Sequence, residues 1–252
     1  MRLRQVAFVA HDLEARASEL CETLGLEVAY RDDGVARFGL VNVVVPLGGD
    51  FLEIVSPARE GTSAGRYLDR RGGDGGYMVI LLTEDALAHR ARITAMGIRD
   101  IWRHDADDYR ATHFHPRDCD GVLLSVDSVT RASDIGERLC EWHPAGPSWR
   151  DKIHDDLVDR LLAVEIQAAD PAAVADHWAD ILARTARHDG TRHEVALDQG
   201  TIRFVADRDD RGVSAIDVRA PGRERILANA AARGLVHTDD RVTICGVRIN
   251  LL

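Results

Sequence analysis

The chain has 252 residues, of which 45% are hydrophobic, enough to bury one or two ordinary cores. Its formal net charge of -10 argues against a nucleic-acid backbone or an anionic membrane as the main partner. The sequence contains no apolar leader and no apolar run of 18 residues, so we expect a cytoplasmic protein without a membrane span. Its four cysteines lie far apart and fit no metal or disulfide spacing.

One local pattern recurs four times, beginning near residues 5, 78, 163 and 215. Each copy reads as a strand, a marked turn, an amphipathic helix and a closing small residue. The turns are marked by Asp12, Asp85, Asp170 and Gly222, and the helices close at Gly25, Gly97, Ala183 and Gly234. Segments rich in Val, Leu and Ile follow each helix and are divided by turn residues such as Asp120-Gly121. The pattern therefore predicts four βαβββ units in an α+β fold.

The repeat stops between Arg131 and Leu157, where Pro144, Gly146 and Pro147 interrupt any regular pattern. We therefore predict an N-terminal domain over residues 1–130, a linker over 131–158 and a C-terminal domain over 159–252. Each domain would contain two of the four units.

Several motifs of the N-terminal half resemble one superfamily. They are an Asp-Leu turn into the first helix, the helix end Leu24-Gly25-Leu26 and the strand FLEIVSP, and they resemble the vicinal oxygen chelate superfamily. That group includes glyoxalase I, methylmalonyl-CoA epimerase, extradiol dioxygenases and bleomycin-resistance proteins. The likeness is best over residues 3–128 and implies two glyoxalase-like domains. Because this scaffold hosts many reactions, it implies a fold more strongly than an activity.

The resemblance also carries over the family's metal positions, which fall on Gln5, Glu53, Met78 and Ser125. Hard divalent ions prefer oxygen ligands, whereas a thioether suits soft ions. Only the first two positions keep a suitable oxygen donor, so we expect the family's usual metal site to be lost. The matching positions of the C-terminal half are Ala163, Arg203, Ala215 and Asn250, which form no chelate. That half would be a degenerate copy that covers the first domain or dimerises.

A different metal site is suggested by Thr112-His113-Phe114-His115, an extended stretch. Alternation along a strand would place His113 and His115 on one face, roughly 7 Å apart. With Glu53 they would form a 2-His-1-carboxylate site for Fe, Mn, Ni or Zn. The alternative is that the histidines point outward or hydrogen-bond an anion, and that no metal binds.

Glu53 is the candidate catalytic residue, because it alternates with apolar neighbours in a buried strand. If it faces a cavity, desolvation would raise its pKa and make it a general base. Alternatively, it forms a salt bridge with Arg66, Arg70 or Arg71. The candidate substrate contacts are Gln5, Met78, Arg103, His113, His115 and Ser125, although Arg103 could equally belong to a solvated rim.

Two functions remain open for the predicted N-terminal cavity. The first is a lyase, isomerase or oxygenase acting on a small oxygenated metabolite, with a non-standard metal or none. The second is a metal-free protein of the bleomycin-resistance type that sequesters an antibiotic or metabolite. Aromatic residues make up only 5% of the chain, which disfavours a large stacking platform. The expected partners are a small molecule and, for a homodimer, a second copy of the chain.

Overall fold

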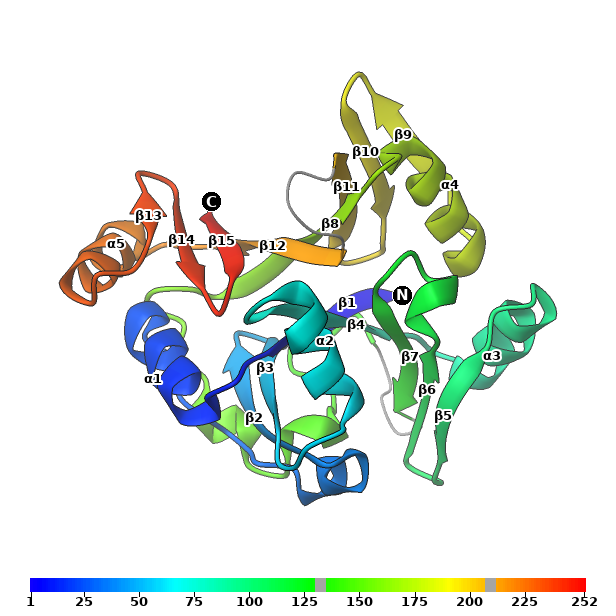
Figure 1. The fold of residues 1–252 in the computed structure, drawn as a ribbon, viewed down its shortest axis with the longest axis horizontal. Helices are drawn as coiled ribbons and strands as arrows, with labels where there is room; N and C mark the ends of the chain where they lie inside the picture. The colour runs from blue at the N-terminus through cyan, green and yellow to red at the C-terminus, as the bar shows by residue number, and fades with distance from the viewer. Residues whose placement is uncertain (130–134, 207–211) are drawn as a thin grey trace. The chain divides into compact units, whose positions relative to one another are not determined.

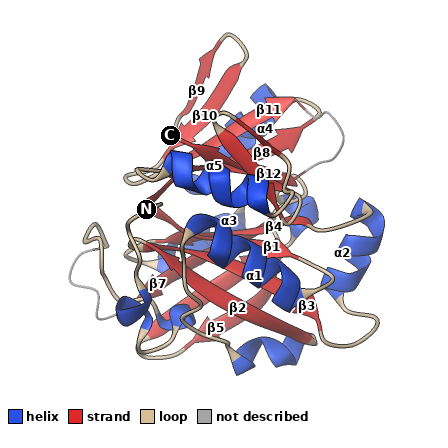
Figure 2. Ribbon diagram, turned by 90° about the vertical axis from the view of Figure 1, so that its left-hand side faces the viewer, coloured by secondary structure: helices blue, strands red, loops and turns tan. Residues whose placement is uncertain are grey.

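The computed structural model describes residues 1–129, 135–206 and 212–252, and Figure 1 follows the chain through them. The strands form one sheet of seven, β1 to β7, and one of eight, β8 to β15. The helices are few and lie against the sheets (Figure 2). This architecture confirms the predicted α+β fold with two glyoxalase-like domains. Residues 130–134, at the predicted boundary between domain and linker, lie outside the described part.

The elements follow the four predicted copies. The first copy holds β1 (Arg2–Val9), α1 (Leu13–Leu24), β2 (Leu40–Leu47) and β3 (Asp50–Pro57), and α2 (Ser63–Arg71) follows it. The second holds β4 (Gly75–Leu82), α3 (Ala86–Ala95), β5 (Asp100–Asp105), β6 (Tyr109–Phe114) and β7 (Leu123–Val129). The third holds β8 (Arg160–Ala168), α4 (Pro171–Leu182), β9 (Ala186–Asp189), β10 (Arg192–Ala196) and β11 (Thr201–Ala206). The fourth holds β12 (Gly212–Arg219), α5 (Arg223–Ala232), β13 (His237–Thr238), β14 (Arg241–Ile244) and β15 (Val247–Leu251). Short 3-10 helices are η1 (Asp33–Phe38), η2 (Pro116–Asp118), η3 (His143–Ala145) and η4 (Trp149–Lys152).

The predicted turn residues begin the helices. The side chains of Asp12, Asp85 and Asp170 each accept a hydrogen bond from the backbone N–H three residues later, at 3.0, 2.9 and 3.1 Å respectively. Such a cap satisfies one of the amides that an α-helix leaves without a partner in its first turn. At the other end, Gly25 and Ala183 close α1 and α4 in the left-handed conformation. The residues that recur at aligned positions in the four copies therefore mark where the helices begin and end.

The first copy departs from the βαβββ pattern in one detail. Between α1 and β2 it has no named strand, only an isolated antiparallel bridge between Tyr30 and Val44. The segment that follows folds into η1, where the side chain of Asp32 accepts from the N–H of Gly34 at 2.7 Å. This local capping competes with extended pairing, so the expected strand shrinks to a single bridge.

The chain divides into two compact units. The first compact unit contains residues 1–5, 77–141 and 163–214, and the second contains 6–76, 142–162 and 215–252. Each unit thus combines one copy from the N-terminal half with one from the C-terminal half. Within the first unit the strand orders are β4-β7-β6-β5 and β8-β11-β10-β9, and within the second they are β2-β3-β1 and β13-β14-β15-β12. The division into domains at residues 131–158 stays a prediction from the sequence repeat.

Equivalent helix contacts occur in both units. In the first unit, Arg92 of α3 donates to two backbone carbonyls in the last turn of α4. In the second, Asn229 of α5 donates to two carbonyls in the last turn of α1, at 3.3 and 3.2 Å. Arg92 and Asn229 are both the seventh residue of their helices. Last-turn carbonyls lack the usual α-helical donor four residues later, so they are open to a donor from outside the helix, and each unit supplies one from the same position.

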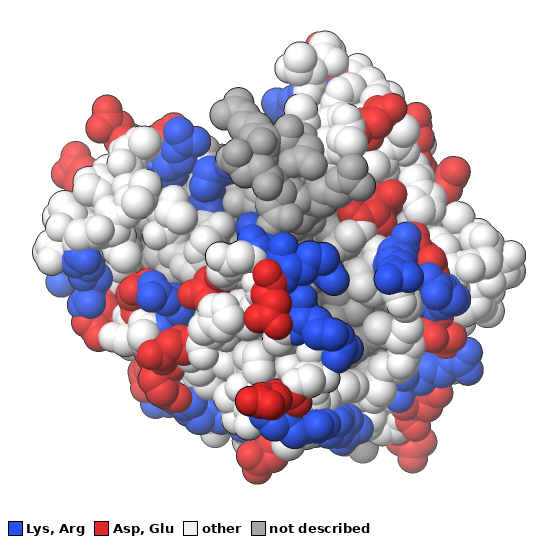
Figure 3. Space-filling view, in the orientation of Figure 1, with Lys and Arg blue, Asp and Glu red and all other residues white. Residues whose placement is uncertain are grey.

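The surface carries charges of both signs. Acidic and basic side chains are interspersed over the face drawn in Figure 3. Within the described residues, no helix has the length and apolar character needed to span a membrane.

Candidate functional site

Strands β4, β7, β6 and β5 of the first compact unit carry a polar site on one face. In register, Ser125 of β7 lies opposite His113 of β6, and His113 lies opposite Trp102 of β5. Asp127 lies opposite Ala111, which in turn lies opposite His104. Because directly paired residues project to the same side of a sheet, Ser125, Asp127, His113, Trp102 and His104 share one face.

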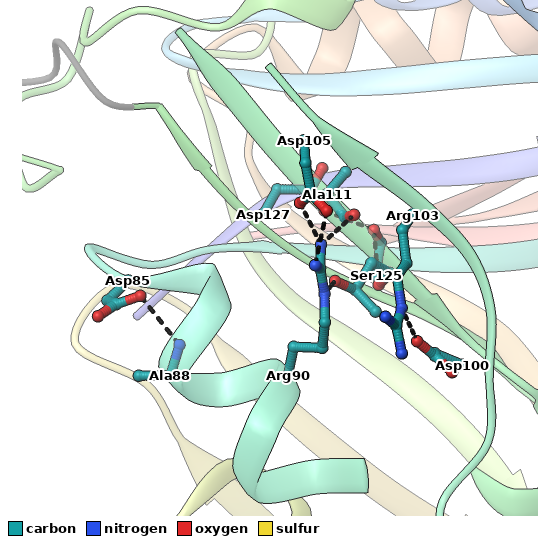
Figure 4. A network of polar contacts seen from close by, with 10 residues as sticks. Asp85, Ala88, Arg90, Asp100, Arg103, Asp105, Ala111, Ser125 and Asp127 are labelled. Carbon is teal, nitrogen blue, oxygen red and sulfur yellow. Dashed lines mark hydrogen bonds and ion pairs between the residues drawn. The ribbon is translucent and has the colours of Figure 1, made fainter. Parts of the chain in front are cut away.

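The centre of this face is the carboxylate of Asp127, which is only 1% exposed. The hydroxyl of Ser125 donates to its Oδ1 at 2.5 Å, and the hydroxyl of Tyr109 donates to its Oδ2. Figure 4 shows the contact between Ser125 and Asp127. Burial raises the pKa of Asp127 to about 7, outweighing the hydrogen bonds from Ser125, Tyr109 and the backbone of Thr112. A carboxyl group in this state can both accept and release a proton near neutral pH.

Four neighbouring rings share this face of the sheet, and we call them the aromatic face: Trp102, His104, Tyr109 and His113. The ring centroid of Trp102 lies 4.4 Å from that of His113 and 5.9 Å from that of His104. The His104 and Tyr109 centroids are 5.7 Å apart. Burial lowers the pKa of His113 to about 3, so its imidazole is neutral at pH 7.

The opposite face of these strands packs against α3. The guanidinium of Arg90 donates to both carboxylate oxygens of Asp105, at 2.9 and 2.7 Å (Figure 4). It also donates to the hydroxyl of Thr112 at 2.6 Å. Arg103 lies opposite Thr112 in register and forms an ion pair with Asp100. The structure therefore places Arg103 on the α3 side, away from the face that holds Asp127. Its predicted contact with substrate stays a prediction.

The two histidines of the HxH stretch have different surroundings. His113 lies within β6, against Trp102. His115 lies beyond the end of β6 and begins η2, where its Nδ1 accepts a hydrogen bond from the N–H of Arg117 at 3.1 Å. Among the residues that the structure describes, no group of three or more His, Cys, Asp or Glu is placed to hold a metal ion. His113, His115 and Glu53 therefore do not form such a group in the structure.

Glu53 lies in β3 of the second compact unit and is 7% exposed. The side-chain amide of Asn42 donates to its Oε1 at 2.7 Å. The candidate salt-bridge partners have other contacts. Arg66 donates to the Gly61 carbonyl and the Ser63 hydroxyl, Arg71 donates to the Asp74 carbonyl, and Arg70 lies over the Tyr67 ring. Glu53 is thus a buried carboxylate held by an amide, and its role as a base stays a prediction.

The residues at the family's metal positions do not fit a hard divalent ion. Gln5, Met78 and Ser125 are all buried. Met78 offers only a thioether, and the Ser125 hydroxyl already donates to Asp127. One oxygen of Glu53 already accepts from Asn42. In the C-terminal half, Arg203 pairs with Glu165 at 3.3 Å, so a guanidinium stands at a position where a ligand would be needed.

Asp127, Tyr109 and Trp102 were not predicted as site residues from the sequence. One local signal for Asp127 was available, because Ser125 and Asp127 are two residues apart in an apolar strand and therefore share a face. Tyr109 and Trp102 gave no comparable signal, since their positions depend on how β5 and β6 pair with β7.

Comparisons with known proteins agree with this fold. The glyoxalase-like domain family matches residues 6–182. The ethylmalonyl-CoA/methylmalonyl-CoA epimerase of Cereibacter sphaeroides is 29% identical over 132 residues, which are 51% of this chain and 98% of that protein. A Streptomyces coelicolor methylmalonyl-CoA epimerase, solved with 2-nitronate-propionyl-CoA, is 25% identical with a TM-score of 0.47, covering 51% of this chain and 97% of its own. A hypothetical protein from Staphylococcus aureus has a TM-score of 0.69 at 9% identity and covers 100% of this chain and 98% of its own.

The chain therefore belongs to the glyoxalase-like family, within the vicinal oxygen chelate superfamily that its motifs predicted. The epimerase of Cereibacter sphaeroides corresponds to about half of this chain, and the Staphylococcus aureus protein shares the fold over its full length.

Proposed function

We propose that this protein catalyses proton transfer at the carbon next to a carbonyl group of a small oxygenated metabolite, with Asp127 as the general base. The observation that carries the proposal is the buried carboxylate whose pKa burial raises to about 7. A general base works best when its pKa lies near the working pH, and buried carboxylates with this property are enriched in active sites.

The step follows from the groups around Asp127. The ionised carboxylate takes a proton from the α-carbon, and the electron pair of the broken C–H bond moves to the carbonyl oxygen as an enolate. The hydroxyl of Tyr109, which donates to Asp127 at rest, is the group within the network that can turn to donate to that enolate. The hydroxyl of Ser125 holds the other carboxylate oxygen in place. Return of the proton to the opposite face of the enolate gives the epimer, and its return to a different atom gives an isomer.

The names of the relatives support this class of reaction. An epimerase inverts one carbon centre, and removal and return of a proton beside a carbonyl is a direct way to do so. The proton transfer needs only residues of this chain, and the donor set at the family's metal positions does not fit a hard divalent ion.

The test is hydrogen–deuterium exchange at the α-carbon, followed by NMR in D₂O with propionyl-CoA and 2-tetralone as probes. We expect the wild-type exchange rate to rise with pH through about 7, since only the ionised carboxylate is a base. Asp127→Asn should lower the rate by roughly 10²- to 10⁴-fold. The control is Asp118→Asn, because Asp118 forms an ion pair with Arg99 outside this network.

Exchange that is equal in the wild type and Asp127→Asn would refute the assignment of the base. Saturable binding of the probes without exchange would instead support the sequestering protein.

A further inference from the structure

Trp102 is distinguished from the other tryptophans by its exposure. Trp142, Trp149 and Trp178 are each no more than 1% exposed, and so belong to the core. Trp102 is only partly buried, as are His104, Tyr109 and His113. The chain is poor in aromatic residues, yet it leaves four rings in one place partly open to solvent. Where these rings lie is therefore a better guide to the kind of ligand that could bind than the low aromatic content of the whole chain.

The four rings form a continuous row on one side of the hairpin of β5 and β6. The planes of Trp102 and His104 differ by 17°, so these two rings are close to parallel. His113 and Tyr109 continue the row at either end, tilted by 48° and 40° from their neighbours. Parallel rings with centroids 4.5 to 7 Å apart offer faces and edges against which another planar ring system can stack.

Neither His113 nor Arg103 offers a positive charge on this face. The low pKa of His113 leaves its imidazole neutral, and Arg103 lies on the other side of β5. Without a cation at these two positions, the stacked rings favour a ligand that is itself flat and uncharged over a phosphate or a carboxylate.

We propose that the aromatic face binds a planar, uncharged ketone fused to an aromatic ring and presents its α-carbon to Asp127. The proposal rests on the proposed function, for which it names the substrate class. Tyr109 connects the two parts, since its ring contacts His104 while its hydroxyl donates to Asp127. The C–H bond beside the carbonyl breaks, its proton passes to the carboxylate and its electron pair to the carbonyl oxygen. In D₂O a deuteron returns to the carbon, so the reaction needs no oxidant or reductant.

The experiment compares 2-tetralone with 2-decalone, which has the same carbon skeleton and carbonyl but no aromatic ring. Dissociation constants come from NMR titration, and α-exchange rates come from the same samples in D₂O. We expect wild-type protein to bind 2-tetralone about tenfold more tightly than 2-decalone. Trp102→Leu should remove this preference, and Trp102→Phe should keep part of it. The control is Ile101→Ala, since Ile101 is a 51% exposed residue of the same strand outside the aromatic face.

Equal affinity for the two ketones in the wild type would overturn the proposal, as would a preference that survives in Trp102→Leu. Circular dichroism of each variant excludes unfolding as the cause of a lost preference. The two proposals fail separately. If 2-tetralone binds more tightly than 2-decalone but no α-exchange occurs, the aromatic face is supported and the general base is refuted. If α-exchange occurs but binding depends neither on the aromatic ring of the ketone nor on Trp102, the general base is supported and this substrate class is refuted.

Discussion

Replacing Asp127 with Asn should make the stability of the protein less dependent on pH. The pKa of Asp127 rises from 3.8 to about 7 on folding, because burial disfavours the charged form. Between these values the folded state holds a proton that the unfolded state has released, so wild-type stability falls as pH rises. Below about pH 4 the Asp127 carboxyl is protonated in both the folded and the unfolded state. Above about pH 7 it is ionised in both states, so the loss of stability is complete at high pH. The amide of the Asp127→Asn variant has no such proton to lose.

The magnitude follows from the two pKa values. A rise from 3.8 to about 7 corresponds to at most about 4 kcal/mol, since each tenfold change is 1.36 kcal/mol. About 2 to 3 kcal/mol of this falls between pH 5 and pH 8. The cost of fitting an amide among three hydrogen-bond donors is the same at both pH values, so it cancels from the comparison.

The assay is urea denaturation of both proteins at pH 5 and pH 8. The free energy of unfolding of Asp127→Asn minus that of the wild type should be about 2 to 3 kcal/mol more positive at pH 8 than at pH 5. For comparison, Asp118→Asn should show the same difference from the wild type at both pH values. The guanidinium of Arg99 holds the pKa of Asp118 well below its usual range, so that carboxyl titrates below pH 5. If the Asp127→Asn difference is also the same at both pH values, the carboxyl is not desolvated and the argument for a general base fails.

Two further predictions concern the fold. A Cβ at Gly246 would lie 2.1 Å from a backbone oxygen, whereas Gly234 has the same φ of +68° and open space around it. Chemical denaturation should therefore show that Gly246→Ala lowers the free energy of unfolding by more than ~3 kcal/mol, and Gly234→Ala by only ~1 kcal/mol. Similar losses in the two variants would show that the backbone at Gly246 can relax. Arg92→Ala and Asn229→Ala should each lower the free energy of unfolding by about 1 kcal/mol. Each should speed amide hydrogen exchange only in the helix that the side chain contacts, which is α4 for Arg92 and α1 for Asn229. Exchange that rises equally in both helices would contradict the assignment of these contacts to separate units.

The local features of the fold could be predicted because their causes lie within a few residues. An Asp at the start of a helix accepts from an amide three residues later, and a left-handed residue such as Gly25 ends a helix, whatever the rest of the chain does. The segment between α1 and β2 forms only a single β-bridge and a 3-10 helix capped by Asp32, in place of the expected strand. Even this difference is local in origin, and it marks the limit of predicting strands from apolar content.

The candidate site was harder to predict. The resemblance to the superfamily pointed to Glu53 and Met78, whereas the alternation of side chains along a strand pointed to the HxH stretch. Alternation correctly indicates that Ser125 and Asp127 share a face, but it does not tell which residues of β5 and β6 lie beside them. His115 also shows that a spacing of two residues means little once the strand ends between them.

By itself, the sequence determined the four copies, the positions where their helices begin and end, and the family, because each depends on a local pattern repeated along the chain. Only the tertiary structure decided that Asp127 is buried and that Tyr109, Trp102 and His113 share its face of the sheet. That arrangement depends on the register of β5, β6 and β7, which is fixed by pairing between strands and not by any one strand. The raised pKa of Asp127 follows from burial, which likewise exists only when distant segments pack together.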